Sequence, residues 1–254
     1  MQIVVAIKQV PARDSTIRIA PHGRWIEEPD LSFEINEPDA YALETALLLK
    51  EKHGGEVTVL CAGPDRARST IRDALAKGAD RAIHIECENL ESRDTLGVAR
   101  LLAGAVRQEK ADLILTGLQS DDLGMGQTGV VLAQILGIPH ATIVMEVEIQ
   151  GSSLRVKREL EDGWFQWVEM PLPALLTIQS GISKLRYATL MGIKKAKTKE
   201  VCHLEAGSDI DLSSVTLHRV YVPEKKKQTR MIDGGPAEAA AQLVDVLRSE
   251  VRVL

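Results

Sequence analysis

Residues 117–129 contain four glycines and two aspartates, and they lie where a predicted strand ends and a predicted helix begins. The apolar run at 111–116 predicts a buried parallel strand, and a helix is predicted from Gln127 until Gly137. Such a junction presents unpaired backbone N–H groups and the positive end of the helix dipole to an anion. The segment indicates a nucleotide site, and it fits an ordinary turn of an α/β sheet equally well.

The glycine spacing in this segment excludes two common nucleotide motifs. It matches neither GxGxxG nor GxxxxGK[ST], and the lysine of the second motif is absent, which argues against a P-loop ATPase. Gly124 and Gly126 have no Cβ to hold a phosphate away from the backbone. For Asp121 and Asp122 we favour binding a ribose or capping the helix over acting as an acid–base pair.

No catalytic set stands out elsewhere in the sequence. It contains neither a GxSxG nucleophile elbow nor an HExxH metal motif. The six histidines do not cluster at metal-ligand spacing, so no metal site is predicted. The three cysteines fit neither a disulfide framework nor a CxxC site, and Cys61 is expected to be a buried small apolar residue.

The composition predicts an ordinary soluble protein. The 254 residues are 44% hydrophobic and 26% charged. A net charge of -5 argues against nucleic-acid binding, although basic runs occur at 194–199 and 225–227. No apolar stretch approaches the roughly 20 residues that span a bilayer, and no signal peptide is evident at the N-terminus. We therefore expect a reduced, cytoplasmic protein without stable membrane insertion.

The order of predicted elements indicates the fold class. Strands and helices alternate up to residue 137, and this order with short connections predicts an α/β fold with a doubly wound, mostly parallel sheet. Polar residues at both Asn36 and Asp39 are able to cap the first helix. Strands are expected at 3–7, 56–62, 81–85, 111–116, 143–149, 154–159, 164–168 and 174–179, and helices before Gly54, before Gly78, at 94–110 and before Gly137.

Regular periodicity fades after Ser183. Basic runs and strand-like pieces such as 215–222 precede a helix predicted at 237–251. A long, poorly periodic arm is unusual in a self-contained domain. We therefore divide the chain into an α/β nucleotide-binding domain at 1–182 and an extended arm at 183–254 that is expected to wrap a partner subunit.

Several segments resemble the beta subunit of electron transfer flavoproteins, in the order in which that family has them. LRYATLMGIKKAKTKEV, residues 185–201, is similar to the family pattern PRYATLxxIxKAKxK. GLQSDDLGMGQTG resembles the family's nucleotide loop, GxQxxDxxxxQTG. The segments VAIKQV, INEPDAYALE, RDALAKGADRAIHIE and VKRELEDG also match. The resemblance covers essentially the whole chain and implies a Rossmann-like fold of the adenine nucleotide alpha hydrolase type.

The resemblance implies an electron carrier and not an enzyme. It implies a heterodimer in which an alpha subunit holds most of the redox-active FAD, while the beta subunit wraps around it and holds a structural AMP. Electrons would come from flavin-containing dehydrogenases. The residues of this chain that match the family's nucleotide site are Ala6, Asn36, Glu37, Pro38, Asp39, Ala62, Asp122, Gly126, Gln127, Thr128, Gly129, Val130 and Val131.

The resemblance also implies a recognition loop that docks dehydrogenases through an apolar anchor. A protruding leucine ringed by polar residues is a plausible small hot spot. The anchor would be Leu190. The matching loop consists of Arg186, Tyr187, Ala188, Thr189 and Leu190.

The chain departs from the family pattern at several positions. Leu185 stands where the family usually has proline, and Met191-Gly192 replaces a common Pro-Asn. Arg13 falls where some members place an aromatic residue against the flavin, and the loop at 123–126 lacks the usual acidic and asparagine residues. Two alternatives stay open: a bifurcating subunit with a second FAD, whose TAQVGP-like loop is not matched, and a non-redox adenine-nucleotide module.

Overall fold

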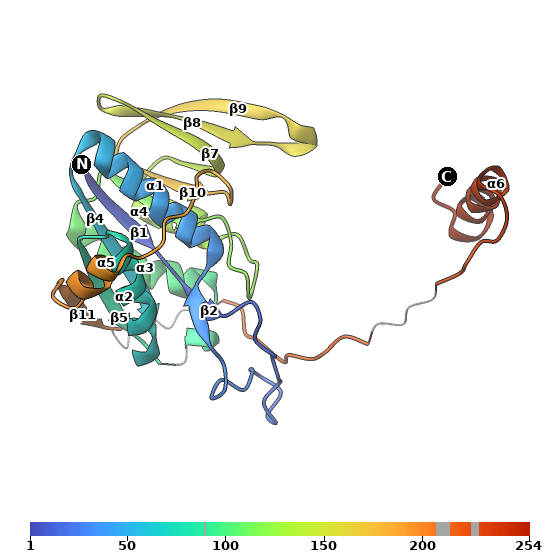
Figure 1. Cartoon of the computed structure of the whole chain (residues 1–254), viewed down its shortest axis with the longest axis horizontal. Helices are drawn as coiled ribbons and strands as arrows, with labels where there is room; N and C mark the ends of the chain where they lie inside the picture. Colours follow the sequence, from blue (N-terminus) through green and yellow to red (C-terminus); the bar gives the residue numbers. More distant parts are fainter. Residues whose placement is uncertain (89, 207–213, 225–228) are drawn as a thin grey trace. The chain divides into compact units, whose positions relative to one another are not determined.

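One sheet of nine strands organises the part of the chain that the structure describes, in the order β11-β5-β4-β1-β6-β10-β7-β8-β9 (Figure 1). The computed structural model describes every residue except 89, 207–213 and 225–228, so the basic run at 225–227 lies outside the described residues. The strands are β1 Gln2–Ala6, β4 Glu56–Gly63, β5 Arg81–Glu86, β6 Leu113–Gly117, β7 His140–Gln150, β8 Ser153–Glu159, β9 Phe165–Pro171, β10 Ala174–Ile178 and β11 Val201–Glu205.

Helices cover both faces of this sheet. Neighbouring residues of β1 show the two layers, because Val5 packs with α1 and α2 while Val4 packs with α3 and α4. The helices are α1 Glu37–His53, α2 Arg68–Lys77, α3 Thr95–Glu109, α4 Thr128–Leu136 and α5 Leu190–Ala196, with short turns η1 Asp65–Ala67, η2 Leu90–Ser92 and η3 Glu161–Gly163. A separate pair, β2 Gln9–Pro11 and β3 Phe33–Ile35, is antiparallel.

The strand directions confirm the predicted fold class. β1 pairs in parallel with β4 on one side and with β6 on the other, and β5, β10 and β11 continue the parallel sheet. The predicted hairpin around residues 150–153 is present as the antiparallel pair β7–β8, which β9 extends. After β1 the next strands, β4 and β5, lie on one side of it, and the later strands β6 and β10 lie on the other side. Crevices for ligands form at such switch points.

The segment after residue 183 contributes two elements that the sequence pattern does not reveal. β11 pairs with β5 along the edge of the sheet. α5 packs against α2 so closely that a Cβ on Gly192 would lie 2.2 Å from the carbonyl oxygen of Ala76. The strand predicted at 215–222 is wrong, because this stretch has no strand partner and its apolar residues Val215 and Val222 are exposed.

The chain forms two compact units, Met1–Val220 and Tyr221–Leu254, and the second is described here by itself. It contains α6 Pro236–Val246, followed by one wider turn, η5 Leu247–Val251, so the helix predicted at 237–251 is confirmed. Leu243 and Val244 of α6 are both more than two-fifths exposed. The arm boundary at residue 183 and its wrapping role stay predictions.

Across the described residues, no helix combines the length and apolar character that a membrane crossing needs.

Candidate functional site

A cleft of about 1250 Å³ opens at the carboxyl ends of β1, β4 and β6. Its walls come from the loops after these strands, from the start of α3 and from the start of α4. This is the switch point of the sheet, where α/β proteins bind their ligands. Nine of the sequence-predicted nucleotide residues line the cleft: Ala6, Asn36, Asp39, Ala62, Asp122, Gly126, Gln127, Thr128 and Gly129.

The other four predicted residues, Glu37, Pro38, Val130 and Val131, do not line the cleft. The Glu37 carboxylate instead forms an ion pair with Arg13, the residue that departs from the family pattern. The backbone of Pro38 lies directly behind Gly117, where a Cβ would approach it to 2.7 Å.

Asn36 and Asp39 connect α1 to the loops of the cleft. Nδ2 of Asn36 donates to the Gln119 carbonyl at 2.9 Å, and Oδ1 accepts from the Asp121 N–H at 2.8 Å. Asn36 occupies the N-cap position of α1, but its side chain does not cap the helix. The Asp121 carboxylate accepts from the Glu37 N–H at 3.2 Å in its place. The polar atoms of Asn36 and Asp39 are used by chain segments that are distant in sequence and close in space.

The Asp39 carboxylate is buried and receives two backbone donors. The Lys8 N–H donates to Oδ2 at 2.7 Å, and the Gly117 N–H donates to Oδ1 at 2.8 Å. A Cβ at Gly117 would lie 2.4 Å from Oδ1, so this approach requires glycine. Burial raises the pKa of Asp39 to about 7, against the opposing effect of the two donors. Asp39 thereby joins the ends of β1 and β6.

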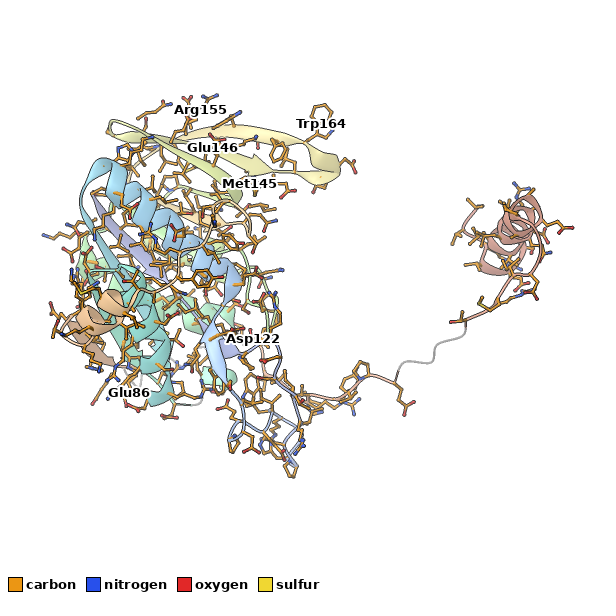
Figure 2. The ribbon with its side chains drawn as sticks, viewed as in Figure 1. Glu86, Asp122, Met145, Glu146, Arg155 and Trp164 are labelled. Atoms are coloured by element: carbon orange, nitrogen blue, oxygen red, sulfur yellow. The ribbon has the colours of Figure 1, made fainter. Side chains whose placement is uncertain are left out.

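Lys8 and Asp122 form an ion pair at the cleft, with Nζ 2.6 Å from Oδ1 (Asp122 is labelled in Figure 2). Partial burial alone would raise the pKa of Asp122, but the Lys8 ammonium and hydrogen bonds from Lys8, Ser120 and the Leu123 N–H lower it below its ordinary value. Sequence reasoning missed Lys8. Its place two residues after the end of β1 was the available signal.

The start of α4 supplies the anion-binding feature of the cleft. No side chain caps this helix at Gln127. The first N–H groups of a helix have no carbonyl partner four residues back, so they are available to a ligand. Gly124 and Gly126 have φ angles of 62° and 63°, and this left-handed backbone turns the loop toward the helix.

Gly129 has a different role from the loop glycines. A Cβ there would lie 2.6 Å from the Thr177 methyl carbon and 2.7 Å from the Thr116 hydroxyl oxygen. Its missing side chain therefore lets α4 pack against β6 and β10. The space that a side chain at Gly129 would need is filled by the sheet, so glycine at this position serves packing.

Further lining residues were not predicted from the sequence. They come from loops that follow β4 and β5 and from the hairpin-like segment before β3. Examples are Trp25, Pro64, Arg66, Leu90 and Thr95.

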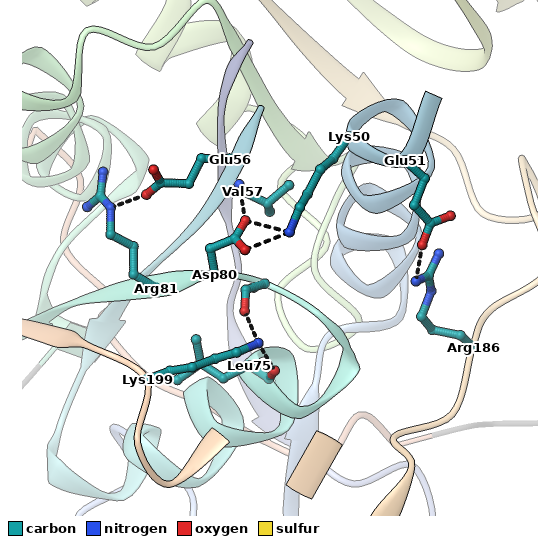
Figure 3. A network of polar contacts seen from close by, with 10 residues as sticks. Lys50, Glu51, Glu56, Val57, Leu75, Asp80, Arg81, Arg186 and Lys199 are labelled. Carbon is teal, nitrogen blue, oxygen red and sulfur yellow. Dashed lines mark hydrogen bonds and ion pairs between the residues drawn. The ribbon is translucent and has the colours of Figure 1, made fainter. Parts of the chain in front are cut away.

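The predicted recognition loop divides into an anchored arginine and an exposed apolar part. Tyr187 is 92% exposed and Leu190 is 88% exposed. The Arg186 guanidinium pairs with Glu44 on α1. It also pairs with Glu51 on the same helix (Figure 3). The Thr189 hydroxyl accepts from the Gly192 N–H and caps α5, which starts at Leu190.

The segment after α5 is also held to the core. Nζ of Lys199 donates to the carbonyls of Leu75 and Ala79 at 2.9 and 2.5 Å, at the end of α2 (Figure 3). Lysine at this position satisfies carbonyls that the helix leaves unpaired. The exposed residues Tyr187 and Leu190 therefore project from a fixed base.

Comparisons with known proteins find relatives along nearly the whole chain. A family model described as the electron transfer flavoprotein domain matches residues 24–209. An electron transfer flavoprotein subunit beta from Methylophilus methylotrophus is 37% identical over 260 residues, covering 97% of this chain and 98% of its own length. Those of Bacillus subtilis (37% identical, covering 95% and 96%) and Homo sapiens (35% identical, covering 100% and 99%) are similar along their lengths. The chain belongs to the family of electron transfer flavoprotein beta subunits.

Proposed function

We propose that the chain is the beta subunit of a heterodimeric, cytoplasmic electron transfer flavoprotein and that it holds one AMP in the cleft at the carboxyl ends of β1, β4 and β6. The observation that carries the AMP assignment is the uncapped start of α4 beside the left-handed glycine loop. Both features favour a phosphate group. In this role the protein carries electrons and does not itself catalyse bond chemistry.

The residues of the cleft fit a nucleoside monophosphate. The N–H groups of Thr128 and Gly129 would hold the phosphate, because they open the uncapped helix. The Lys8 ammonium lies at the same cleft, where it is paired with Asp122. Leu90, Val98 and other apolar side chains offer surface to a base. Charge-assisted bonds to a phosphate contribute about 1.5–3 kcal/mol each.

The redox group of the proposed complex is FAD, held mostly by the alpha subunit. When bound, its flavin ring accepts electrons from a dehydrogenase and passes them on. In this complex the chain binds AMP, associates with the alpha subunit and exposes its recognition loop at 186–190 to dehydrogenases. The arm at 183–254 is the part that we assign to wrapping that subunit.

The recognition loop at 186–190 would bind flavin-containing dehydrogenases through Leu190. Its side chain is almost wholly exposed, and Tyr187 and Met191 beside it are exposed as well. Single apolar residues are common on protein surfaces, but this group lies on a base that ion pairs and a helix cap fix in place. A fixed apolar group loses little entropy on binding, which favours its use as an anchor.

The size of the cleft keeps one alternative open, a bifurcating subunit with a second FAD. Small-molecule sites typically measure about 300–1,000 Å³, so a cleft of about 1250 Å³ has room for a dinucleotide. The GQTG sequence at 126–129 favours AMP, since the bifurcating pattern differs there.

The test is to co-express the chain with the larger subunit, denature the purified complex and count the nucleotides by chromatography. We expect AMP and FAD in equal amounts, with one of each per heterodimer. Two FAD and no AMP would assign the protein to the bifurcating class. A complex that forms with the larger subunit but releases no adenine nucleotide beyond one FAD would contradict the proposed role of the cleft.

A further inference from the structure

The structure brings together two histidines that the sequence separates by more than a hundred residues. β11 pairs in parallel with β5, and His203 lies directly beside His84 in this register. The two rings meet edge to face, with centroids 5.7 Å apart. The expectation that the histidines form no cluster therefore fails at this edge of the sheet.

Glu86 completes a group of three potential metal ligands. It lies two residues after His84 on β5, so both side chains project from the same face of the strand. Among the described residues, one ligand atom from each of His84, Glu86 and His203 lies within 4.8 Å of the others. Glu86 is labelled in Figure 2. None of the three residues lines the nucleotide cleft.

The hydrogen bonds of His84 prepare one of its nitrogens for a metal ion. The ring is fully buried, and Nε2 lies 3.0 Å from the Gly63 carbonyl oxygen, which can only accept. In the neutral ring the proton is therefore on Nε2, and Nδ1 carries the lone pair. Nδ1 is buried and has no hydrogen-bond partner among the described residues. Metal-binding histidines typically donate their second nitrogen to a backbone carbonyl in this way.

We propose that His84, Glu86 and His203 bind a Zn²⁺ ion, with Nδ1 of His84 as the buried ligand. Two imidazoles and one carboxylate, with water in the fourth position, form a common zinc set. Ca²⁺ and Mg²⁺ prefer oxygen ligands throughout, so they suit this site poorly.

The side chains have room to close around the ion. Tetrahedral zinc with ligand distances of about 2.0–2.1 Å places its ligand atoms roughly 3.3 Å apart. His203 is exposed and Glu86 is partly exposed, so both can move toward the fixed His84. Arg68 pairs with Asp65 at 2.8 Å and with Glu86 at 3.6 Å. Zinc would therefore replace a long, partly exposed ion pair of Glu86.

The ion would cross-link the edge strand to the sheet. β11 already ends with the Ala206 N–H donating to the Glu86 carbonyl at 3.2 Å. Metal bonds between β5 and β11 would add a second connection at the same place. An ion that binds only the folded chain stabilises it by mass action, so zinc should raise the melting temperature.

The experiment uses the full-length chain, stripped with a chelator and dialysed. Zn²⁺ is titrated by calorimetry, Co²⁺ is added separately as an absorbing substitute, and melting curves are recorded with and without Zn²⁺. We expect one ion per chain, a tetrahedral Co²⁺ spectrum and a higher melting temperature. His203→Ala and Glu86→Gln should each weaken Zn²⁺ binding by about 10- to 100-fold or more.

Two comparisons make the result decisive. His203 is exposed, so His203→Ala should melt like the wild-type chain in the absence of metal. His53→Ala removes another exposed histidine, at the end of α1, and should bind zinc normally. Absence of saturable binding in the wild-type chain would overturn the proposal. Unchanged affinity in a correctly folded His203→Ala variant would overturn it too.

Discussion

Arg186 closes a bidentate ion pair with Glu44, a residue 142 positions earlier in the sequence. Its Nε lies 2.8 Å from Oε2, and its Nη2 lies 2.9 Å from Oε1. The Glu44 side chain is only 6% exposed. The loop that presents Tyr187 and Leu190 is thus fixed to α1 by a contact whose glutamate is nearly buried.

This contact predicts that Arg186→Ala is destabilising. The substitution leaves the Glu44 carboxylate buried without its partner, and breaking such a pair from one side costs about 3–5 kcal/mol. Urea unfolding of the two proteins would measure the loss. Arg230→Ala is a suitable control, because Arg230 and Glu250 are both well exposed and such pairs contribute about 0–1 kcal/mol. Equal effects of the two substitutions would show that Arg186 does not anchor the loop.

Because Leu190 is exposed, replacing it should weaken docking to a dehydrogenase without lowering the stability of the chain. Burying a leucine in a partner's pocket contributes about 1.5–3 kcal/mol, which corresponds to roughly a ten- to hundredfold change in affinity. Leu190→Ala should weaken electron transfer from the partner dehydrogenase by about that factor. The melting temperature and flavin spectrum of the heterodimer should barely change, because Leu190 has little contact with its own chain.

Dehydrogenase-coupled reduction rates measured over a range of carrier concentrations would test this prediction. Leu48→Ala provides the matched control, since Leu48 is 44% exposed on α1 and lies outside the recognition loop at 186–190. If both variants couple normally, Leu190 is not the anchor. If Leu190→Ala mainly lowers the melting temperature, the leucine supports the fold instead.

The parallel core could be predicted from the sequence because its signal is local. Buried strands such as β4 and β6 are continuous apolar runs, and glycines mark the ends of the helices. β11 escaped prediction for a physical reason. It is an edge strand whose exposed residues, Cys202, His203 and Glu205, are mostly polar, so its short sequence does not look apolar.

The cleft was predicted in outline, and its internal contacts were not. The glycine loop and the start of α4 are consecutive in sequence, so the loop-to-helix junction could be predicted from it. The bond from Gly117 to Asp39 joins residues 78 positions apart, and the bond from Lys8 to Asp122 joins residues 114 apart. Only the folded chain shows such pairings. The tight packing of Gly129 depends on strand order in the same way.

The left-handed loop predicts that Gly126→Ala loosens the nucleotide. Gly126 has a φ angle of 63° with space for a Cβ, so the substitution introduces backbone strain of about 1–2 kcal/mol and no clash. Relief of that strain would shift the loop before α4. Gly151→Ala carries the same strain at φ 64° in the β7–β8 turn, which does not line the cleft. AMP retained after dialysis of the complex should fall for Gly126→Ala only.

Substitution at Gly129 should behave differently. Gly129→Val would force side-chain atoms against Thr116 and Thr177, so we expect a lower melting temperature of the whole chain. Nucleotide would then be lost together with the fold. A Gly129→Val protein of normal stability would contradict the packing role assigned to this glycine.

Asp39 predicts a dependence of stability on pH. Burial raises the pKa of Asp39 to about 7 in the folded chain, from 3.8 as the ordinary value. Below pH 4 the carboxyl is protonated in both states, so it adds no pH dependence. Between about pH 4 and 7 the unfolded chain releases this proton while the folded chain retains it. Each pH unit in that window therefore favours unfolding by up to about 1.4 kcal/mol, and the loss levels off above it.

Comparison with Asp39→Asn isolates this effect, because the amide does not titrate. The variant loses one of the two acceptors for the N–H groups of Lys8 and Gly117, which is a cost independent of pH. Wild type should therefore be the more stable protein at pH 5, and its advantage should shrink by about 1–3 kcal/mol at pH 8. Urea unfolding at both pH values measures the difference, and the histidines common to both proteins cancel. An advantage that grows with pH would mean that the two backbone donors outweigh burial and keep the Asp39 carboxylate ionised.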